Sequence, residues 1–165
     1  MSIVNKQAPN FIASAILKNN KIVNNFNFKN YLNKKIGILF FWPMSFLNIY
    51  LEEMIFFNKN YNKLLENNAK IIGISCDSEF ANLKWKNIIK KNNKIGNINF
   101  PIVSDKKREI IRFYNIENEN TGMALKSIFI IDKCNIIRFE LIQYNIFFKI
   151  NIISILNIIN FLNKK

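Results

Sequence analysis

Residues 36–42, Ile-Gly-Ile-Leu-Phe-Phe-Trp, form a nearly continuous apolar run that leads into Pro43. A β-strand has this pattern when both of its faces are covered, because none of its side chains is then exposed to solvent. The segment 51–67 that follows carries apolar residues at spacings that suit a helix with one buried face. We therefore predict a buried strand that runs through Pro43 into a helix, and the need to cover both faces of the strand favours an α/β protein.

The rest of the chain alternates apolar runs with longer amphipathic segments. These predict further strands at 71–76, 127–131 and 136–142, and further helices at 80–91, 107–114 and about 150–162. The last two strands are separated by Asp132-Lys133-Cys134-Asn135 and are predicted to form a hairpin. This order predicts a thioredoxin-like α/β sandwich, in which helices flank a central mixed β-sheet. With 165 residues, the chain is expected to form one domain, 1–165.

The composition excludes several kinds of active site. The sequence has no histidine, which removes the commonest general base and the commonest metal ligand, and with them hydrolase triads and histidine metal centres. Its two cysteines, Cys76 and Cys134, lie far apart and outside any Cys-x-x-Cys spacing, so neither a disulfide framework nor a zinc site is indicated. We expect no cofactor and no metal ion.

Hydropathy and charge limit the partners of the chain. No apolar run reaches the roughly 18 residues that span a bilayer, and the amino terminus lacks the pattern of a secretory leader, so we expect a cytoplasmic protein without a membrane partner. The formal net charge of +13 raises the question of a nucleic-acid partner. However, the lysines are scattered among asparagines, and the prevalence of Asn, Ile, Lys and Phe indicates an AT-rich genome. We therefore do not expect nucleic acid as the main partner.

Several motifs in order resemble those of a known family. Residues 40–53, Phe-Phe-Trp-Pro-Met-Ser-Phe-Leu-Asn-Ile-Tyr-Leu-Glu-Glu, resemble the peroxide-reducing segment of typical two-cysteine peroxiredoxins, the alkyl hydroperoxide reductase and thiol-specific antioxidant type. Ala8-Pro9-Asn10-Phe11 and Ile72-Gly73-Ile74-Ser75-Cys76-Asp77-Ser78 are similar to the family motifs Ala-Pro-Asp-Phe and Val-Gly-Val-Ser-x-Asp-Ser. The segments 22–28, 83–87, 99–105 and 124–133 also fall in family order, so the resemblance covers about residues 4–162.

The resemblance implies a peroxide-reducing thiol site, but this sequence lacks the nucleophile. In the family, a cysteine seven residues after the proline attacks the peroxide, and here Tyr50 holds that position. In the family, a threonine and an arginine hold the peroxide; here Leu47 stands at the position of the threonine and Lys126 at that of the arginine. Pro43 and Glu53 are the same as in the family. Tyrosine has a reference pKa near 10, so its ionisation at pH 7 costs about 4 kcal/mol, and a phenolate forms no sulfenic acid.

The leading hypothesis is therefore a peroxiredoxin-family protein that has lost its peroxidase activity. The function of the lineage is thiol-dependent reduction of hydrogen peroxide and alkyl hydroperoxides in redox homeostasis, and we expect a structural or holdase-like role to remain. In this interpretation Tyr50 fills the emptied pocket rather than acting as a radical or acid/base site. Lys126 is solvated or paired with Glu53 rather than bound to an anion in the remnant pocket. The resemblance also implies a homodimer or a ring of dimers and a thioredoxin or disulfide reductase partner. We expect the carboxy-terminal arm with the family's resolving Val-Cys-Pro to be absent.

Two alternatives stay open. Cys76 ends the predicted strand 71–76, on the same face as Ile72 and Ile74, and is either a buried structural thiol or a residual redox thiol whose pKa Lys126 lowers. The +13 charge could instead serve a basic nucleic-acid or anion-binding module. Cys134, in the predicted hairpin turn, is expected to be exposed and oxidisable.

Overall fold

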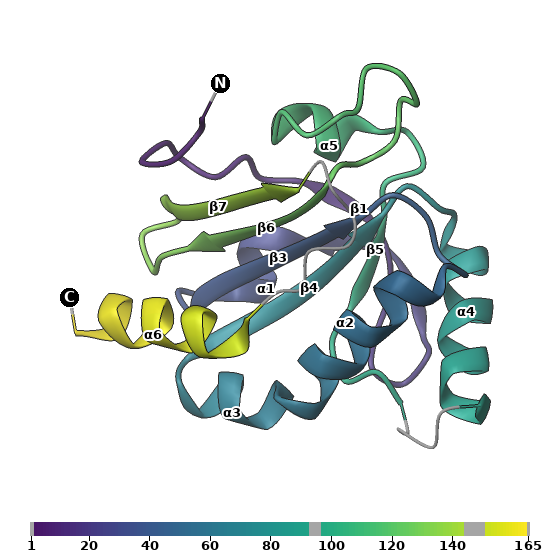
Figure 1. Ribbon diagram of the computed structural model, residues 1–165, viewed down its shortest axis with the longest axis horizontal. Coiled ribbons are helices and arrows are strands. Elements are labelled where there is room, and N and C mark those ends of the chain that lie inside the picture. The colour runs from purple at the N-terminus through teal and green to yellow at the C-terminus, as the bar shows by residue number, and fades with distance from the viewer. Residues whose placement is uncertain (1, 93–96, 144–150, 165) are drawn as a thin grey trace.

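The computed structural model describes residues 2–92, 97–143 and 151–164 and shows one β-sheet with helices packed against both of its faces (Figure 1). The strands are β1 (Ile12–Ile16), β2 (Ile22–Asn27), β3 (Ile36–Trp42), β4 (Ala69–Ser75), β5 (Ile102–Ser104), β6 (Lys126–Ile131) and β7 (Ile137–Gln143). The helices are α1 (Phe28–Leu32), α2 (Asn48–Lys59), α3 (Tyr61–Glu66), α4 (Glu79–Asn92), α5 (Glu109–Phe113) and α6 (Ile152–Asn163). None of the helices in these residues combines the length and the apolar character needed to cross a membrane.

The strand β3 lies inside the sheet, whose strand order is β2-β1-β5-β4-β3-β6-β7. It pairs in parallel with β4 and antiparallel with β6, so that Phe40 is aligned with Gly73 on one side and with Ile128 on the other. Every residue of β3 is buried. The sheet is therefore mixed, as predicted, and the predicted strand 36–42 has the bounds of β3.

The side chains of β3 alternate between two apolar clusters. Phe40 and Trp42 belong to the cluster that α2, α4 and α6 cover, whereas Leu39 and Phe41 belong to the cluster that α1 and α5 cover. This alternation follows from the two-residue period of a strand. The neighbouring strand approaches closely at Gly73, where a Cβ atom would lie 2.7 Å from the ring of Trp42. The size of the tryptophan ring therefore requires a glycine opposite it.

Most of the elements predicted from periodicity are confirmed. The strand at 71–76, the helices at 80–91 and 107–114 and the hairpin correspond to β4, α4, α5 and the antiparallel pair β6–β7, with ends that differ by a few residues. The last predicted helix corresponds to α6, while residue 150 lies outside the described residues. Periodicity did not indicate β1, α1 or β5, because elements of five, five and three residues contain too few repeats.

The single helix predicted at 51–67 is wrong. The structure shows two helices, α2 and α3, with the break at Asn60, whose backbone angles are φ −97° and ψ 6°. The side-chain amide of Asn60 donates a hydrogen bond of 2.9 Å to the carbonyl oxygen of Phe56. Asparagine side chains compete in this way with the backbone for helical acceptors, and apolar periodicity does not register that competition.

A buried lysine fastens α4 to the turn between β1 and β2. The side chain of Lys86 is 1% exposed, and its ammonium group donates hydrogen bonds to the carbonyl oxygens of Leu17 at 2.7 Å and Lys18 at 3.2 Å. Burial, and secondly the charge of Lys90, lowers the pKa of Lys86 to about 8. Because the unfolded chain then binds a proton more readily than the folded protein, stability rises as the pH increases from about 8 toward the unfolded pKa of 10.5.

Replacing Lys86 with methionine should abolish this pH dependence. Between about pH 7.5 and about pH 9.5, the free energy of unfolding of the wild type is expected to rise by about 2 kcal/mol relative to that of Lys86→Met. Urea unfolding at the two pH values measures the difference. Lys84→Met, at an exposed position of the same helix, is the matched control and should follow the wild type. Parallel profiles for all three proteins would contradict the assignment.

Candidate active site

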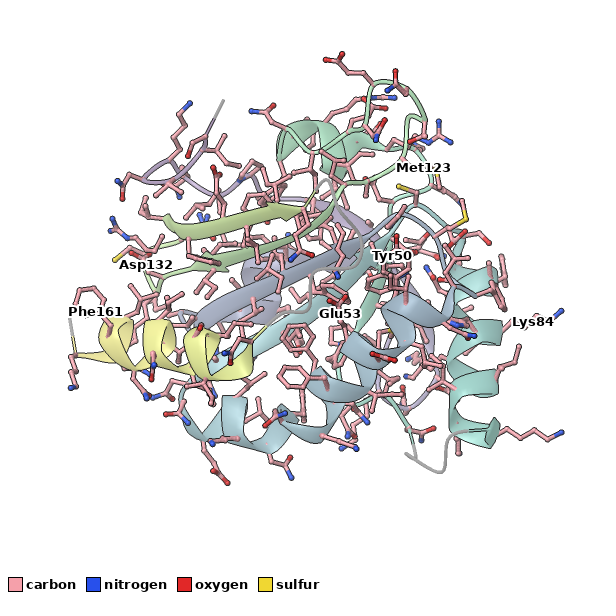
Figure 2. All side chains as sticks on the ribbon, in the orientation of Figure 1. Tyr50, Glu53, Lys84, Met123, Asp132 and Phe161 are labelled. Carbon is pink, nitrogen blue, oxygen red and sulfur yellow. The ribbon has the colours of Figure 1, made fainter. Side chains whose placement is uncertain are left out.

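The connection from β3 to α2 brings the predicted pocket residues to one end of the sheet. Pro43 follows β3 directly and is half-buried. Tyr50 lies in the first turn of α2 and Glu53 lies one turn later, and both side chains are buried (Figure 2). Lys126, also buried, begins β6, which is the antiparallel neighbour of β3. Residues far apart in the sequence therefore meet beside the start of α2.

A network of buried polar groups holds the connecting loop in place. The backbone N–H of Ser45 donates to Asp77 Oδ2 at 2.5 Å, and the Ser45 hydroxyl donates to Asn82 Oδ1 at 2.7 Å. The same oxygen of Asn82 accepts a second hydrogen bond, from the Ser75 hydroxyl at 2.9 Å. Ser45, Ser75 and Asn82 are all buried. The loop is thus fastened to the end of β4 and to α4, and buried polar groups that are satisfied in this way rigidify a structure.

Sequence reasoning did not identify this network as part of the site. Ser75 and Asp77 stand in a motif that carried the family resemblance, but Ser45 and Asn82 have no periodicity that marks them. The available signal was the position of Ser75 and Asp77 at the carboxyl end of a predicted parallel strand, where α/β proteins place their sites. The partners of these residues become evident only in three dimensions.

The side chain of Tyr50 lies in the interior of the protein. It is 2% exposed and belongs to the same apolar cluster as Trp42 and Met54. Burial raises the pKa of the Tyr50 phenol, and the negative charge of Glu53 raises it further. Both causes disfavour the phenolate, so Tyr50 is a poorer nucleophile at neutral pH than a free tyrosine.

Glu53 and Lys126 form a buried ion pair across the pocket. Lys126 Nζ lies 2.5 Å from Glu53 Oε1, and the two side chains are 2% and 9% exposed for the lysine and the glutamate. Of the arrangements considered for Lys126, the structure shows the pairing with Glu53. Removing one member of such a pair leaves a buried charge, which costs about 3–5 kcal/mol. Each member of the pair therefore needs the other for its charge to remain buried.

Leu47 leaves the start of α2 without a side-chain cap. It is the N-cap residue, with φ −94° and ψ 123°, and no side-chain hydrogen bond satisfies the first turn of the helix. Its side chain is 42% exposed. A threonine here, as in the resembled family, would supply an oxygen for the free N–H groups of that turn.

Cys76 has a local environment that suppresses its reactivity. The thiol is partly buried against the cluster that contains Ile72 and Ile74, as the alternation predicted. Burial raises the pKa of Cys76 to about 11, although a backbone hydrogen bond at Ala124 opposes the rise. The expected lowering of this pKa by Lys126 is therefore wrong. At pH 7 only about one thiol in ten thousand would be ionised, and the thiolate is the reactive form.

Cys134 is exposed in the turn between β6 and β7, as predicted. Its backbone N–H donates a hydrogen bond of 2.9 Å to Asp132 Oδ1, which shapes the turn. Both cysteines are free thiols. Among the residues that the structure describes, no three His, Cys, Asp or Glu side chains are grouped so that they could hold a metal ion.

Comparison with known proteins shows that the sequence is similar to one family. The AhpC/TSA family pattern matches residues 4–140. Alkyl hydroperoxide reductase C of Buchnera aphidicola subsp. Schizaphis graminum is 45% identical over 163 residues, which cover 99% of this chain and 82% of that protein. Alkyl hydroperoxide reductase C of Helicobacter pylori strain 26695 is 38% identical over 131 residues, which cover 79% of this chain and 66% of that protein.

Solved structures confirm the predicted thioredoxin-like α/β fold. The reduced 2-Cys peroxiredoxin of Plasmodium vivax has a TM-score of 0.86 and 29% identity, and the match covers 97% of this chain and 81% of that one. The mitochondrial 2-Cys peroxiredoxin of Plasmodium falciparum has a TM-score of 0.83 and 34% identity, with 95% and 92% covered. The arrangement of strands and helices around the pocket is therefore shared with proteins of that type.

Introducing a hydroxyl at position 47 should stabilise the protein. Leu47→Thr is expected to increase the free energy of unfolding by about 1 kcal/mol, because the new oxygen can cap α2 while an exposed leucine loses little on removal. Leu47→Ala is the control, since it also shortens the side chain but adds no acceptor. Urea unfolding at pH 7 compares the two variants. Equal stability of Leu47→Thr and Leu47→Ala would show that α2 gains nothing from a cap.

The two thiols should differ in their rate of alkylation. We expect iodoacetamide at neutral pH to modify Cys134 at least about tenfold faster than Cys76, because Cys134 is exposed while Cys76 is partly buried with a raised pKa. Mass spectrometry of the two cysteine-containing peptides over time measures both rates in one sample. Alkylation in concentrated urea is the control and should bring the rates together. A faster reaction at Cys76 in the folded protein would overturn its description as an inert thiol.

Proposed function

The chain belongs to the AhpC/TSA family of peroxiredoxins, and we propose that it retains the family's scaffold without the peroxidase chemistry. The observation that carries the proposal is the buried ring of Tyr50 in the first turn of α2, where the resemblance requires a cysteine. Thiol-dependent peroxide reduction transfers an oxygen to a thiolate and forms a sulfenic acid. A phenol cannot undergo this step, and burial and Glu53 keep this phenol protonated.

The other parts of the pocket support the same proposal. Leu47 provides no hydroxyl to hold a peroxide, and its side chain is 42% exposed. Lys126 keeps the positive charge of the family's arginine, but its ammonium group is taken up by Glu53 and lacks the planar fork that could contact two partners at once. What remains of the pocket therefore serves the packing of the protein.

The two alternatives drawn from the sequence have less support. A residual redox site at Cys76 would need an easily ionised thiol, whereas burial raises the pKa of this one to about 11. A nucleic-acid module would need a basic surface long enough to follow a phosphate backbone, whereas the lysines that share one hollow, Lys29, Lys34, Lys35 and Lys133, line a volume of only about 390 Å³.

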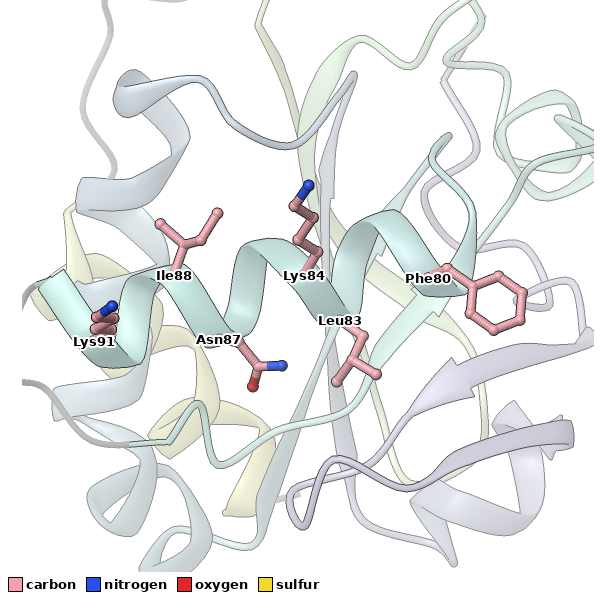
Figure 3. A pocket seen from close by; sticks show the side chains of 6 residues that line it. All are labelled: Phe80, Leu83, Lys84, Asn87, Ile88 and Lys91. Carbon is pink, nitrogen blue, oxygen red and sulfur yellow. The ribbon is translucent and has the colours of Figure 1, made fainter.

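We further propose that the protein acts through association, as a structural or holdase-like component that pairs with a second copy of itself. The support is a set of exposed apolar side chains, which we call the apolar patch: Met44, Phe46 and Leu47 between β3 and α2, and Phe80 and Ile88 on α4. Phe46 packs 6.4 Å from the ring of Trp85, which joins the loop to α4. Figure 3 shows Phe80 and Ile88 along α4, where they line a hollow of about 370 Å³. Apolar patches of this kind mark association surfaces.

The proposed setting is the cytoplasm, where free cysteines such as Cys76 and Cys134 remain reduced. A thioredoxin or disulfide reductase partner, which the family resemblance implies, would find no disulfide to reduce at position 50, because tyrosine forms none. The proposed role therefore does not depend on such a reductant.

The test is peroxide consumption by the purified protein with a thioredoxin system or with dithiothreitol. We expect no consumption above that of the reductant alone, and recovery in Tyr50→Cys/Leu47→Thr of a rate at least about tenfold above background, because the thiol and the hydroxyl then return to a scaffold that is still intact. Tyr50→Ser/Leu47→Thr is the matched control, since it removes the same ring but adds no thiol.

Three results would decide against the proposal. Robust turnover by the wild type would show that the chemistry is not lost. Equal rates for the cysteine and serine variants would show that the scaffold no longer supports the reaction. A monodisperse monomer in light scattering at high concentration, unchanged by Phe46→Ser and Phe80→Ser, would contradict association through the apolar patch.

A further inference from the structure

The turn between β6 and β7 separates two hollows at the end of the molecule remote from Tyr50. Figure 2 shows Asp132 of this turn and Phe161 of α6 at the left of the view, where they line one hollow, with Tyr50 nearer the middle of the molecule. One hollow lies between the turn and α6, and the other lies between the turn and the end of α1. Asp132, Lys133 and Cys134 line both of them.

The hollow beside α6 is mainly apolar. It has a volume of about 730 Å³, and its apolar lining consists of Phe139, Ile158, Phe161 and Leu162. Phe161 is 57% exposed, so a large aromatic surface is accessible from the hollow. Ligand pockets usually have about 300–1,000 Å³ and combine such a lining with a few polar groups at one side.

The hollow beside α1 is strongly basic. It has a volume of about 390 Å³, and four lysines line it: Lys29, Lys34, Lys35 and Lys133. The acidic residue that shares this lining is Asp132, whose carboxylate accepts hydrogen bonds from Arg138 Nε at 2.6 Å and from the backbone N–H of Cys134 at 2.9 Å. The charge of Asp132 is thereby compensated by Arg138 of β7, and the lysines determine the sign of the potential in the hollow.

An apolar hollow and a basic hollow on two sides of one exposed turn match a ligand with two unlike ends. We propose that this end of the protein binds a single anionic amphiphile, with its acyl chain along Phe139 and Phe161 and its carboxylate or phosphate head at Lys34 and Lys133. Burial of the chain would supply the affinity, at about 25 cal/mol per Å² of apolar surface. The lysines would select an anionic head over a neutral one. This site is distinct from the pocket at Tyr50 and does not depend on the proposed function.

The exposed thiol of Cys134 offers a direct probe, because it lines both hollows. Decanoate below its micelle concentration is expected to slow alkylation of Cys134 by iodoacetamide at least about fivefold, with saturation as its concentration rises. Cys76 in the same molecule is the internal reference, and its rate should not change. Peptide mass spectrometry reads both sites together.

Matched variants test the two parts of the site separately. Phe161→Ser should weaken the protection of Cys134 by shortening the apolar contact, and its control is Phe113→Ser on α5, a phenylalanine that is 54% exposed at a different place. Lys34→Glu should weaken protection by repelling the head, and its control is Lys84→Glu, the same charge reversal at an exposed position on α4. Both control variants should be protected as the wild type is.

Other probes distinguish the proposed ligand from simpler explanations. If inorganic phosphate protected Cys134 from alkylation as well as decanoate does, the surface would simply attract any anion. If decanol protected it equally well, the lysines would not contribute to binding. Protection by phosphatidylglycerol vesicles without protection by monomeric decanoate would show a membrane-binding surface instead. Each of these results, or no protection at all, would overturn the proposal.

Discussion

The complete burial of β3 is the constraint on which the rest of the structure depends. All seven residues of this strand are buried, with β4 and β6 on its edges and helices over both faces. A strand without a polar position cannot lie at the surface, so the chain must supply two apolar layers, one around Phe40 and Trp42 and the other around Leu39 and Phe41. Because β3 ends at Trp42, Pro43 and the first turn of α2 lie at the end of the sheet that this strand fixes.

Buried polar contacts fix the loop after β3 and the first turn of α2, and they do so independently of any catalytic reaction. Ser45 is hydrogen-bonded to Asp77 and Asn82, and Glu53 is paired with Lys126. Losing one partner of a buried pair is costly, because the other is left as an uncompensated charge. The side chain at position 50 carries no buried charge that needs a partner, because the aromatic ring of Tyr50 packs into the apolar cluster. These contacts hold the frame of the pocket independently of which side chain occupies position 50.

The two ends of the sheet illustrate different uses of an exposed surface. Beside the pocket, Phe46 and Phe80 expose large apolar side chains, with Lys84 and Lys91 along the same helix as Phe80, which suits a protein partner. At the opposite end, the apolar surface of α6 faces a turn whose other side is lined with lysines, which suits a small ligand of mixed character. The net charge of +13 therefore has a local consequence where four lysines converge, even though the lysines are scattered along the sequence.

The sequence by itself determined the buried strand, the hairpin and the absence of a cysteine at position 50, because apolar periodicity and residue identity are local properties that need no partner. It also placed Cys76 on the face of Ile72 and Ile74, since strand alternation has a fixed period. Only the tertiary structure decided the raised pKa of Cys76 and the break at Asn60. Both depend on which atoms surround a side chain after folding. The spacing of residues in the sequence does not predict that burial or those competing hydrogen bonds.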